Sequence, residues 1–230
     1  MSDNLYVIIE NPNSGALAYL DECLADSVEN SFFFILPKSL DSHLFKELYS
    51  KNIIFWDDQV GSKIVYQTEN WEKGNDFFLF FSPFLDLSYQ FESIMQENEV
   101  TQSFQLARVI SFIDASILIN EMQIIQNWID GAAHFSDALC VTNRDNQNGS
   151  EVSKLFKRYE QLRYPMEKYT VSLSKKGKIA GLLSQTVRRI SHIFDPADLL
   201  EDEDKPDNDI YLTRLPNGNR KKRIPIPFTP

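Results

Sequence analysis

Leu5–Leu20 reads LYVIIENPNSGALAYL, an apolar run that breaks at a small polar loop and continues directly as a helical pattern. A strand, a loop and a helix in this order form the phosphate-binding junction of many nucleotide-binding α/β proteins. That junction normally carries the pattern G-x-x-x-x-G-K-S/T, in which the lysine binds phosphate and the hydroxyl binds magnesium. Counted back from Gly15, the first glycine position is Glu10, and the lysine and hydroxyl positions are Ala16 and Leu17. The stretch therefore keeps the outline of a phosphate loop but has a carboxylate where a phosphate would lie.

The composition favours one α/β domain with a large core, alone or with a tail, because the chain has 230 residues of which 43% are hydrophobic. Phenylalanine-rich runs at 32–36 and 77–81 show no alternation with polar residues. Such runs are typical of strands that are buried on both faces, as in parallel sheets covered by helices. The core is therefore expected to lie on both sides of one sheet.

The net charge of −10 disfavours nucleic acid and anionic membranes as partners, since both attract a basic surface. No apolar run is long enough to cross a membrane, and the start of the chain lacks the basic residues of a signal peptide. Cys23 and Cys140 have no CxxC spacing, so neither a disulfide framework nor a metal site is predicted. We expect a cytoplasmic protein.

Strand-like and helix-like segments alternate along the chain, which predicts a three-layer α/β fold with a doubly wound, mostly parallel sheet. Ligands of such sheets bind at the carboxyl ends of the strands. After the first strand, further strands are expected at 32–36, 52–56, 77–81, 107–113, 138–141 and 169–173, with a weaker candidate at 63–67. Helices are expected at 16–28, 39–49, 85–97, 117–131 and 152–162.

The character of the sequence changes after Ser184, so we expect a domain at 1–184 followed by a linker and tail at 185–230. The linker is expected to contain a helix at 188–194 and a solvated acidic run at 201–204. The basic cluster 220–223 would pair with that acidic run or with an acidic partner.

A hairpin is expected at 209–228, because Asn217 and Gly218 form a strong turn signal between two strand-like arms. Pro225 and Pro227 restrict the second arm to an edge or to an extended segment. The hairpin is expected to dock on a sheet edge or on a second copy of the chain, which would cover its apolar side chains. Those side chains are Ile210, Leu212, Ile224 and Ile226.

The order of segments from Leu5 to Leu183 resembles that of the CobW-type GTPases of the P-loop class. The resemblance rests on motifs at the ends of successive elements. Ser82 and Asp86 match the third motif of the family, Asp114-Ala115 matches the V-D-A that ends its next strand, Ser136–Asp145 covers its A-D-h-h-h-h-N-K-x-D, and Tyr164-Pro165 echoes its L-N-P. The resemblance implies a P-loop NTPase fold with a nucleotide site at the carboxyl edge of the sheet.

The departures from this family fall on the residues that carry its chemistry. Besides the lysine and hydroxyl of the loop, the acidic residue of the third motif is Phe80, and the glycine that senses the γ-phosphate is Pro83, which has no backbone N–H. The Asn-Lys pair of the guanine motif is Thr142 and Asn143, and only Asp145 remains. The metal-binding C-x-C-C segment, expected near 59–63, has no cysteine, and a tail replaces the usual C-terminal domain.

Two classes of function stay open. The first is a non-catalytic pseudo-GTPase that acts as a protein-interaction or regulatory module, with no cofactor and no catalytic residue. Its partner would be another protein or a second copy of the chain, bound through the 209–228 tail. The loss of lysine, hydroxyl, acid and glycine together argues against magnesium-dependent phosphoryl transfer.

The second class is a protein that still binds GTP, GDP or another anion weakly at the old site. The candidate binding residues are Asn13, Ser14, Gly15, Asp114 and Asp145. Backbone N–H groups at the start of a helix attract anions whatever the side chains are. The simpler interpretation of this loop is that Ser14 or Asn13 only caps the helix. Asp114 would likewise hold a loop in place.

Overall fold

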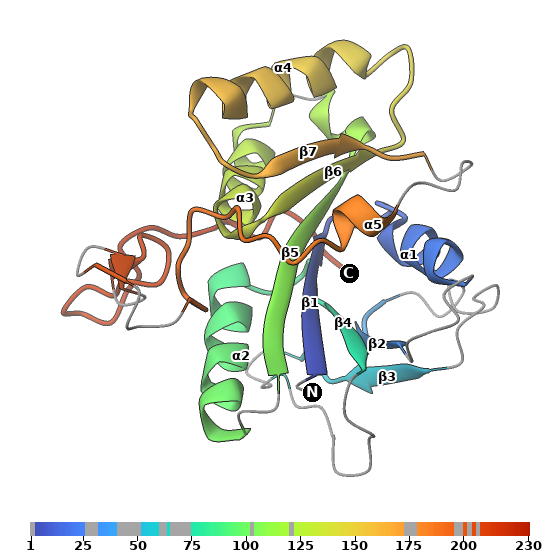
Figure 1. The fold of residues 1–230 in the computed structure, drawn as a ribbon. Helices are drawn as coiled ribbons and strands as arrows, with labels where there is room; N and C mark the ends of the chain where they lie inside the picture. The colour runs from blue at the N-terminus through green and yellow to red at the C-terminus, as the bar shows by residue number, and fades with distance from the viewer. Residues whose placement is uncertain are drawn as a thin grey trace.

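Seven parallel strands form one sheet in a computed structural model of the chain (Figure 1). The structure describes residues 3–25, 32–40, 52–59, 64, 75–101, 104–119, 122–172, 179–195, 200–201, 204–205 and 208–230. The strands are β1 (Asp3–Glu10), β2 (Phe32–Pro37), β3 (Ile53–Trp56), β4 (Asp76–Phe80), β5 (Phe104–Asp114), β6 (Ala138–Thr142) and β7 (Glu167–Thr170), in the order β3-β2-β4-β1-β5-β6-β7. The predicted three-layer α/β fold is therefore confirmed.

Helices cover both faces of the sheet (Figure 1). On one face lie α1 (Ala16–Leu24) and the short α5 (Ile179–Leu182), and on the other lie α2 (Leu87–Thr101), α3 (Gln123–Phe135) and α4 (Gly149–Gln161). Because every connection is a parallel crossover, the carboxyl ends of all the strands meet at one edge of the sheet.

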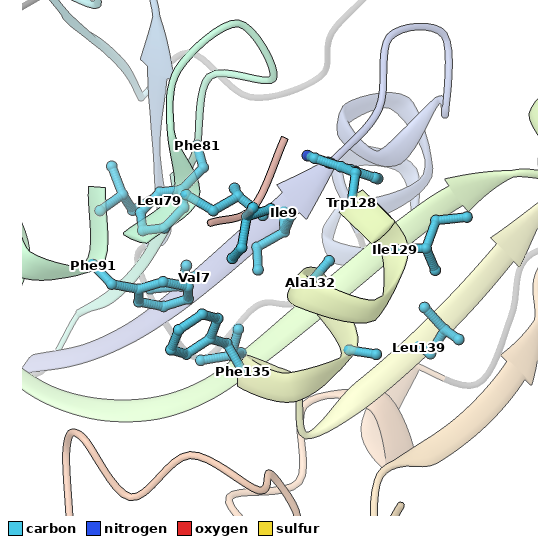
Figure 2. Close-up of a cluster of buried hydrophobic side chains, with 14 of the residues drawn as sticks. Val7, Ile9, Leu79, Phe81, Phe91, Trp128, Ile129, Ala132, Phe135 and Leu139 are labelled. Carbon is cyan, nitrogen blue, oxygen red and sulfur yellow. The ribbon is translucent and has the colours of Figure 1, made fainter. Parts of the chain in front are cut away.

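Alternate residues of the central strands enter two different cores. Val7 and Ile9 of β1 join the cluster under α2, α3 and α4, whereas Tyr6 and Ile8 join the cluster under α1. Figure 2 shows the first cluster, in which Val7, Ile9, Leu79 and Phe81 of the sheet face aromatic and aliphatic side chains of α2 and α3. This arrangement explains the uninterrupted apolar runs, because successive side chains of a strand point to opposite faces and both faces are buried.

The helix expected at 117–131 is wrong in its first half. Asp114 instead accepts a hydrogen bond from the backbone N–H of Ser116 and caps a short 3-10 helix, η2 (Ala115–Leu118). Met122 is extended, and α3 begins only at Gln123. Ile119 and Met122 flank this break and are 48% and 52% exposed.

The helix expected at 188–194 is also wrong, because a buried carboxylate binds the backbone that would start it. Asp137 accepts hydrogen bonds from the N–H groups of Arg188 (2.6 Å) and Arg189 (3.1 Å) and also from Val109 of β5 (2.9 Å). Residues 184–189 consequently run without regular structure along the sheet. Arg189 adds an ion pair to the same carboxylate, with Nη1 3.3 Å from Oδ2.

The tail packs on helices of its own chain instead of on an edge strand. Only one antiparallel bridge, Arg214 with Arg220, remains of the expected hairpin among the described residues, and Gly218 takes a φ of 81° at its turn. Arg220 pairs with Glu92 of α2 at 2.6 Å, which gives that member of the basic cluster a partner outside the acidic run. Ile224 is buried directly against Gly131 of α3.

Of the four apolar side chains of the tail that docking was expected to cover, Leu212 and Ile224 are buried, whereas Ile210 and Ile226 remain exposed. Most of the helix expected at 39–49, most of the strand candidate at 63–67 and part of the acidic run at 201–204 lie outside the described residues. Within the part of the chain that the structure describes, no helix has both the length and the apolar character needed to cross a membrane.

Candidate functional site

Residues 11–15, the loop compared above with a phosphate loop and called the remnant phosphate loop below, lie at the centre of the carboxyl edge, between the end of β1 and the start of α1. Its backbone turns through two left-handed residues, Asn13 with a φ of 67° and Gly15 with a φ of 73°. Gly15 is the N-cap residue of α1 and contributes no side chain to the cap. A positive φ favours glycine at this position, which accounts for the one glycine that the loop keeps.

The side chain of Glu10 lies inside the loop and is bound there by a neighbouring residue. Its carboxylate is buried at the end of β1 and accepts a hydrogen bond from the hydroxyl of Ser14. The Ser14 hydroxyl in turn accepts a hydrogen bond from the backbone N–H of Ala16 at 3.2 Å. Burial raises the pKa of Glu10 to about 7, although the hydrogen bonds from Ser14 and from the Ala16 N–H lower it. The Ser14 hydroxyl and the Ala16 N–H, donors of the kind that bind phosphate in a phosphate loop, therefore bind the Glu10 carboxylate of the same chain.

A network of asparagines connects the loop to the neighbouring strand ends. The side-chain oxygen of Asn11 accepts from the backbone N–H of Asp114 at 2.8 Å. Asn143, which has a φ of 52°, donates to the Asp114 carboxylate at 2.9 Å and to the carbonyl of Asn13 at 3.4 Å. No local pattern predicts this role for Asn11, because its partner Asp114 lies 103 positions away.

Asp145, which the resemblance matched to the guanine motif, is exposed and holds the turn that precedes α4. Its carboxylate accepts from the backbone N–H groups of Gln147 (2.7 Å) and Asn148 (3.0 Å). The side-chain oxygen of Asn148 accepts from the backbone N–H of Asp145 at 2.9 Å, and its amide nitrogen donates to the carbonyl of Asn143 at 3.0 Å. The structure thus brings Asn13, Asp114 and Asp145 to one edge of the sheet through Asn143.

The residues that match the third motif of the GTPases also form local structural contacts. The amide of Gln90 spans the backbone of Ser82, accepting from its N–H at 2.8 Å and donating to its carbonyl at 3.0 Å. Asp86 accepts from the N–H of Tyr89 at 3.0 Å in the first turn of α2. Phe80 is fully buried and contacts Phe34 edge to face. Hydrogen bonds and aromatic packing thus stabilise the chain at the end of β4.

A cavity of about 500 Å³ lies beside the remnant loop. Its walls come from the loop and the first turn of α1, from Ser39-Leu40 after β2, from Pro83-Phe84 after β4, and from Thr229-Pro230 of the tail. Glu10 is the one ionisable side chain among the described residues that line it, and none of those residues is a lysine or arginine. The described walls of the cavity are therefore mainly apolar and carry one side-chain carboxylate.

Other arrangements that resemble catalytic or metal sites are structural. Ser191 and His134 both hydrogen-bond the same oxygen of Asp209, at 2.6 and 2.8 Å, so the histidine does not activate the serine. The His134 and Ser191 contacts hold the pKa of Asp209 below its usual range, against the effect of burial. In the ranges that the structure describes, no three His, Cys, Asp or Glu residues gather in a group suited to a metal ion.

The fold is similar to that of a known GTPase. A crystal structure of a zinc-bound triple mutant of the YjiA GTPase aligns with a TM-score of 0.57 and 14% sequence identity, over 80% of this chain and 62% of that chain. The zinc-bound YjiA GTPase from E. coli aligns over the same shares with 14% identity and a TM-score of 0.49. The first of these confirms the P-loop GTPase fold that the motifs led us to expect. The aligned part of this chain covers 62% of the length of each of these two structures, which is less than two thirds.

At 14% identity the likeness extends to the fold and to no other property. No protein-family model matches the sequence. No curated protein is significantly similar to it either. The function must therefore be argued from the site itself.

Proposed function

We propose that the chain is a non-catalytic pseudo-GTPase, in which a P-loop fold serves as a protein-interaction or regulatory module in a reducing cytoplasm. The single observation that carries the proposal is the Glu10 carboxylate, which accepts the Ser14 hydroxyl hydrogen bond inside the remnant loop. A nucleotide phosphate placed there would meet a carboxylate and no lysine, and the two like charges would repel each other at low dielectric. The two free cysteines, Cys23 and Cys140, agree with a reducing compartment.

Two further features support the loss of phosphoryl transfer. Pro83 follows β4 where the GTPases have a glycine, and proline has no N–H to donate to a γ-phosphate. Phe80 is fully buried in the aromatic core, so no acidic side chain stands there to hold magnesium.

Calorimetric titration of nucleotide-stripped protein with GTP and with GDP, at millimolar magnesium, tests whether the site has lost nucleotide binding. We expect no measurable heat of binding for either nucleotide. Micromolar binding of either one would overturn the pseudo-GTPase proposal.

The alternative function is a protein that binds GTP, GDP or another anion weakly through the loop residues Asn13, Ser14 and Gly15. The observation that favours it is the left-handed backbone at Asn13 and Gly15, which turns the loop into the start of α1. Thermal unfolding with and without millimolar phosphate separates the two functions, because a ligand that binds only the folded state raises the midpoint. An unchanged midpoint supports the pseudo-GTPase, and a raised midpoint supports anion binding.

The proposed interaction face is an apolar patch at the break between η2 and α3. Ile119, Met122 and Ile124 are each more than two-fifths exposed there. A groove of about 420 Å³ continues the patch between α3 and α4, with Ile125, Ile129 and Leu155 among the residues that line it. Contiguous exposed apolar side chains are typical of protein-binding surfaces. We favour this face over the 209–228 tail, because the tail already packs on α2 and α3 of its own chain.

Sedimentation velocity over a hundredfold range of protein concentration tests self-association through this patch. We expect a concentration-dependent dimer that the Met122→Glu/Ile124→Glu variant loses without a change in unfolding midpoint, since both side chains are exposed. Leu162→Glu is the matched control, because Leu162 is 50% exposed at the end of α4, outside the patch. A wild type that is monomeric throughout would contradict self-association.

A further inference from the structure

We propose that the cavity beside the remnant phosphate loop is a binding site for a small apolar molecule that carries one positive charge, with the Glu10 carboxylate as its counter-ion. This inference goes beyond the pseudo-GTPase proposal, because it assigns a different class of ligand to the altered site. It rests on the walls of the cavity and on Glu10, the one ionisable side chain among the described residues that line it.

The walls of the cavity suit an apolar body. Leu17, Leu40, Pro83 and Phe84 supply side chains from three separate segments, and Pro230 closes the site from the tail. A volume of about 500 Å³ lies within the range of roughly 300–1,000 Å³ that small-molecule sites occupy. A site of this kind typically combines apolar walls with a few polar groups that orient the ligand.

The negative charge of Glu10 disfavours nucleotides, which are the ligands of P-loop GTPases. Glu10 is hydrogen-bonded by Ser14 and the Ala16 N–H, and no cationic side chain among the described residues forms an ion pair with it. An anion in this cavity would lie near an uncompensated carboxylate, whereas an ammonium group would neutralise it. The Glu10 side chain is charged at pH 8, since its pKa is about 7. The replacement of lysine by alanine and of glycine by glutamate thus reverses the preferred charge of the ligand.

A matched series of fluorescent probes tests the proposal: 1-naphthylmethylamine, 1-naphthalenemethanol and 1-naphthoate share one apolar body and differ in charge. Titrations of the full chain at pH 8 are followed by fluorescence anisotropy. We expect the amine to bind about tenfold more tightly than the alcohol, which corresponds to about 1.4 kcal/mol. The carboxylate is expected not to bind. Equal binding of all three probes, or binding of none, would overturn the proposal.

Two pairs of variants, each a change at the site with its control on α4, locate the site. Glu10→Gln keeps the shape of the side chain and should abolish the preference for the amine, whereas Glu160→Gln removes an exposed carboxylate on α4 and should leave it unchanged. Ala18→Lys adds a cation at an exposed position of the cavity rim and should weaken amine binding, and Ser153→Lys adds one on the distant surface of α4.

An amine preference that survives in Glu10→Gln would overturn the proposal, and so would equal effects of the two added lysines, because the attraction would then be a property of the whole negatively charged chain. The GTP titration separates this inference from the proposed function. Nucleotide binding would contradict the pseudo-GTPase, whereas failure of the amine to bind would contradict only the inference.

Discussion

The hydroxyl of Ser14 donates a hydrogen bond to the carboxylate of Glu10, and both side chains are buried at the junction of β1 and α1. Serine and glutamate thereby complete a turn that in a working phosphate loop is completed by the bound phosphate. The loop is consequently ordered without a ligand. The hydrogen bond therefore holds the turn between β1 and α1 from within the chain.

Glu10→Gln should change how the stability of the protein depends on pH. Burial raises the pKa of Glu10 from 4.5 to about 7 in the folded chain. Between these values the folded state binds more protons than the unfolded state, so the free energy of unfolding of the wild type falls as the pH rises. Relative to the wild type, Glu10→Gln should therefore gain about 3 kcal/mol between pH 4 and pH 8.

Urea denaturation of both proteins across this pH range measures the effect. Glu160→Gln is the control, because Glu160 is exposed on α4 and its removal should leave the difference from wild type flat. A constant difference between Glu10→Gln and wild type would show that burial leaves the pKa of Glu10 at its ordinary value of 4.5 in the folded protein.

Restoring the missing loop residues should not restore nucleotide binding. Ala16 and Leu17 are buried in the core beneath α1, so the Ala16→Lys/Leu17→Thr variant should lose about 2–4 kcal/mol of stability. Calorimetry should detect no GTP binding, since Phe80 and Pro83 would still stand where the resemblance to the GTPases places the magnesium-binding acid and the γ-phosphate-sensing glycine. Adding Glu10→Gln isolates the contribution of the carboxylate. Micromolar binding by the double or triple variant would mean that the side chains of the loop were the only obstacle.

Asp137→Ala should detach the segment after α5 from the sheet. The buried Asp137 carboxylate accepts from the backbones of Val109, Arg188 and Arg189 and pairs with the Arg189 guanidinium. Its loss leaves a buried cation with one fewer partner, which we expect to cost about 3–5 kcal/mol. Chemical denaturation measures this cost, and hydrogen exchange should show lost protection at 188–189. Asp145→Ala, which removes an exposed turn-capping carboxylate, should cost only about 1 kcal/mol. Equal losses in the two variants would contradict this role of Asp137.

Gly131→Ala should loosen the tail. A Cβ at Gly131 would lie 2.7–2.8 Å from three side-chain atoms of Ile224, so Ile224 must move out of its site on α3. We expect a loss of about 1–3 kcal/mol, the usual cost of overpacking, together with faster hydrogen exchange between 209 and 228. Ile224→Ala should rescue part of the loss in the double variant, because it removes the clash.

Gly181→Ala is the matched control for this experiment. The nearest atom to a Cβ there is the Tyr169 hydroxyl at 3.7 Å, which is an ordinary contact. A tail that is unprotected in wild-type protein, or a Gly131→Ala variant as stable as Gly181→Ala, would contradict docking of the tail on α3.

The sequence by itself determined the sheet. The uninterrupted apolar runs of β1, β2, β4 and β6 can be buried only between two helical layers, because neighbouring side chains of a strand face opposite ways. The same local patterns predicted α1, α2 and α4 within a few residues. The missing lysine and hydroxyl could also be counted directly, since the spacing of a phosphate loop is fixed along the chain.

Only the tertiary structure decided where polar and irregular segments find their partners. Asp137 binds the backbone of Arg188, 51 positions away, and so replaces a predicted helix, while Asp114 caps η2 and shortens another. The tail reaches α3 through Ile224 and the loop cavity through Pro230. Local sequence patterns cannot anticipate such pairings, because a buried hydrogen bond depends on which distant groups the fold brings together and not on the propensity of either segment alone.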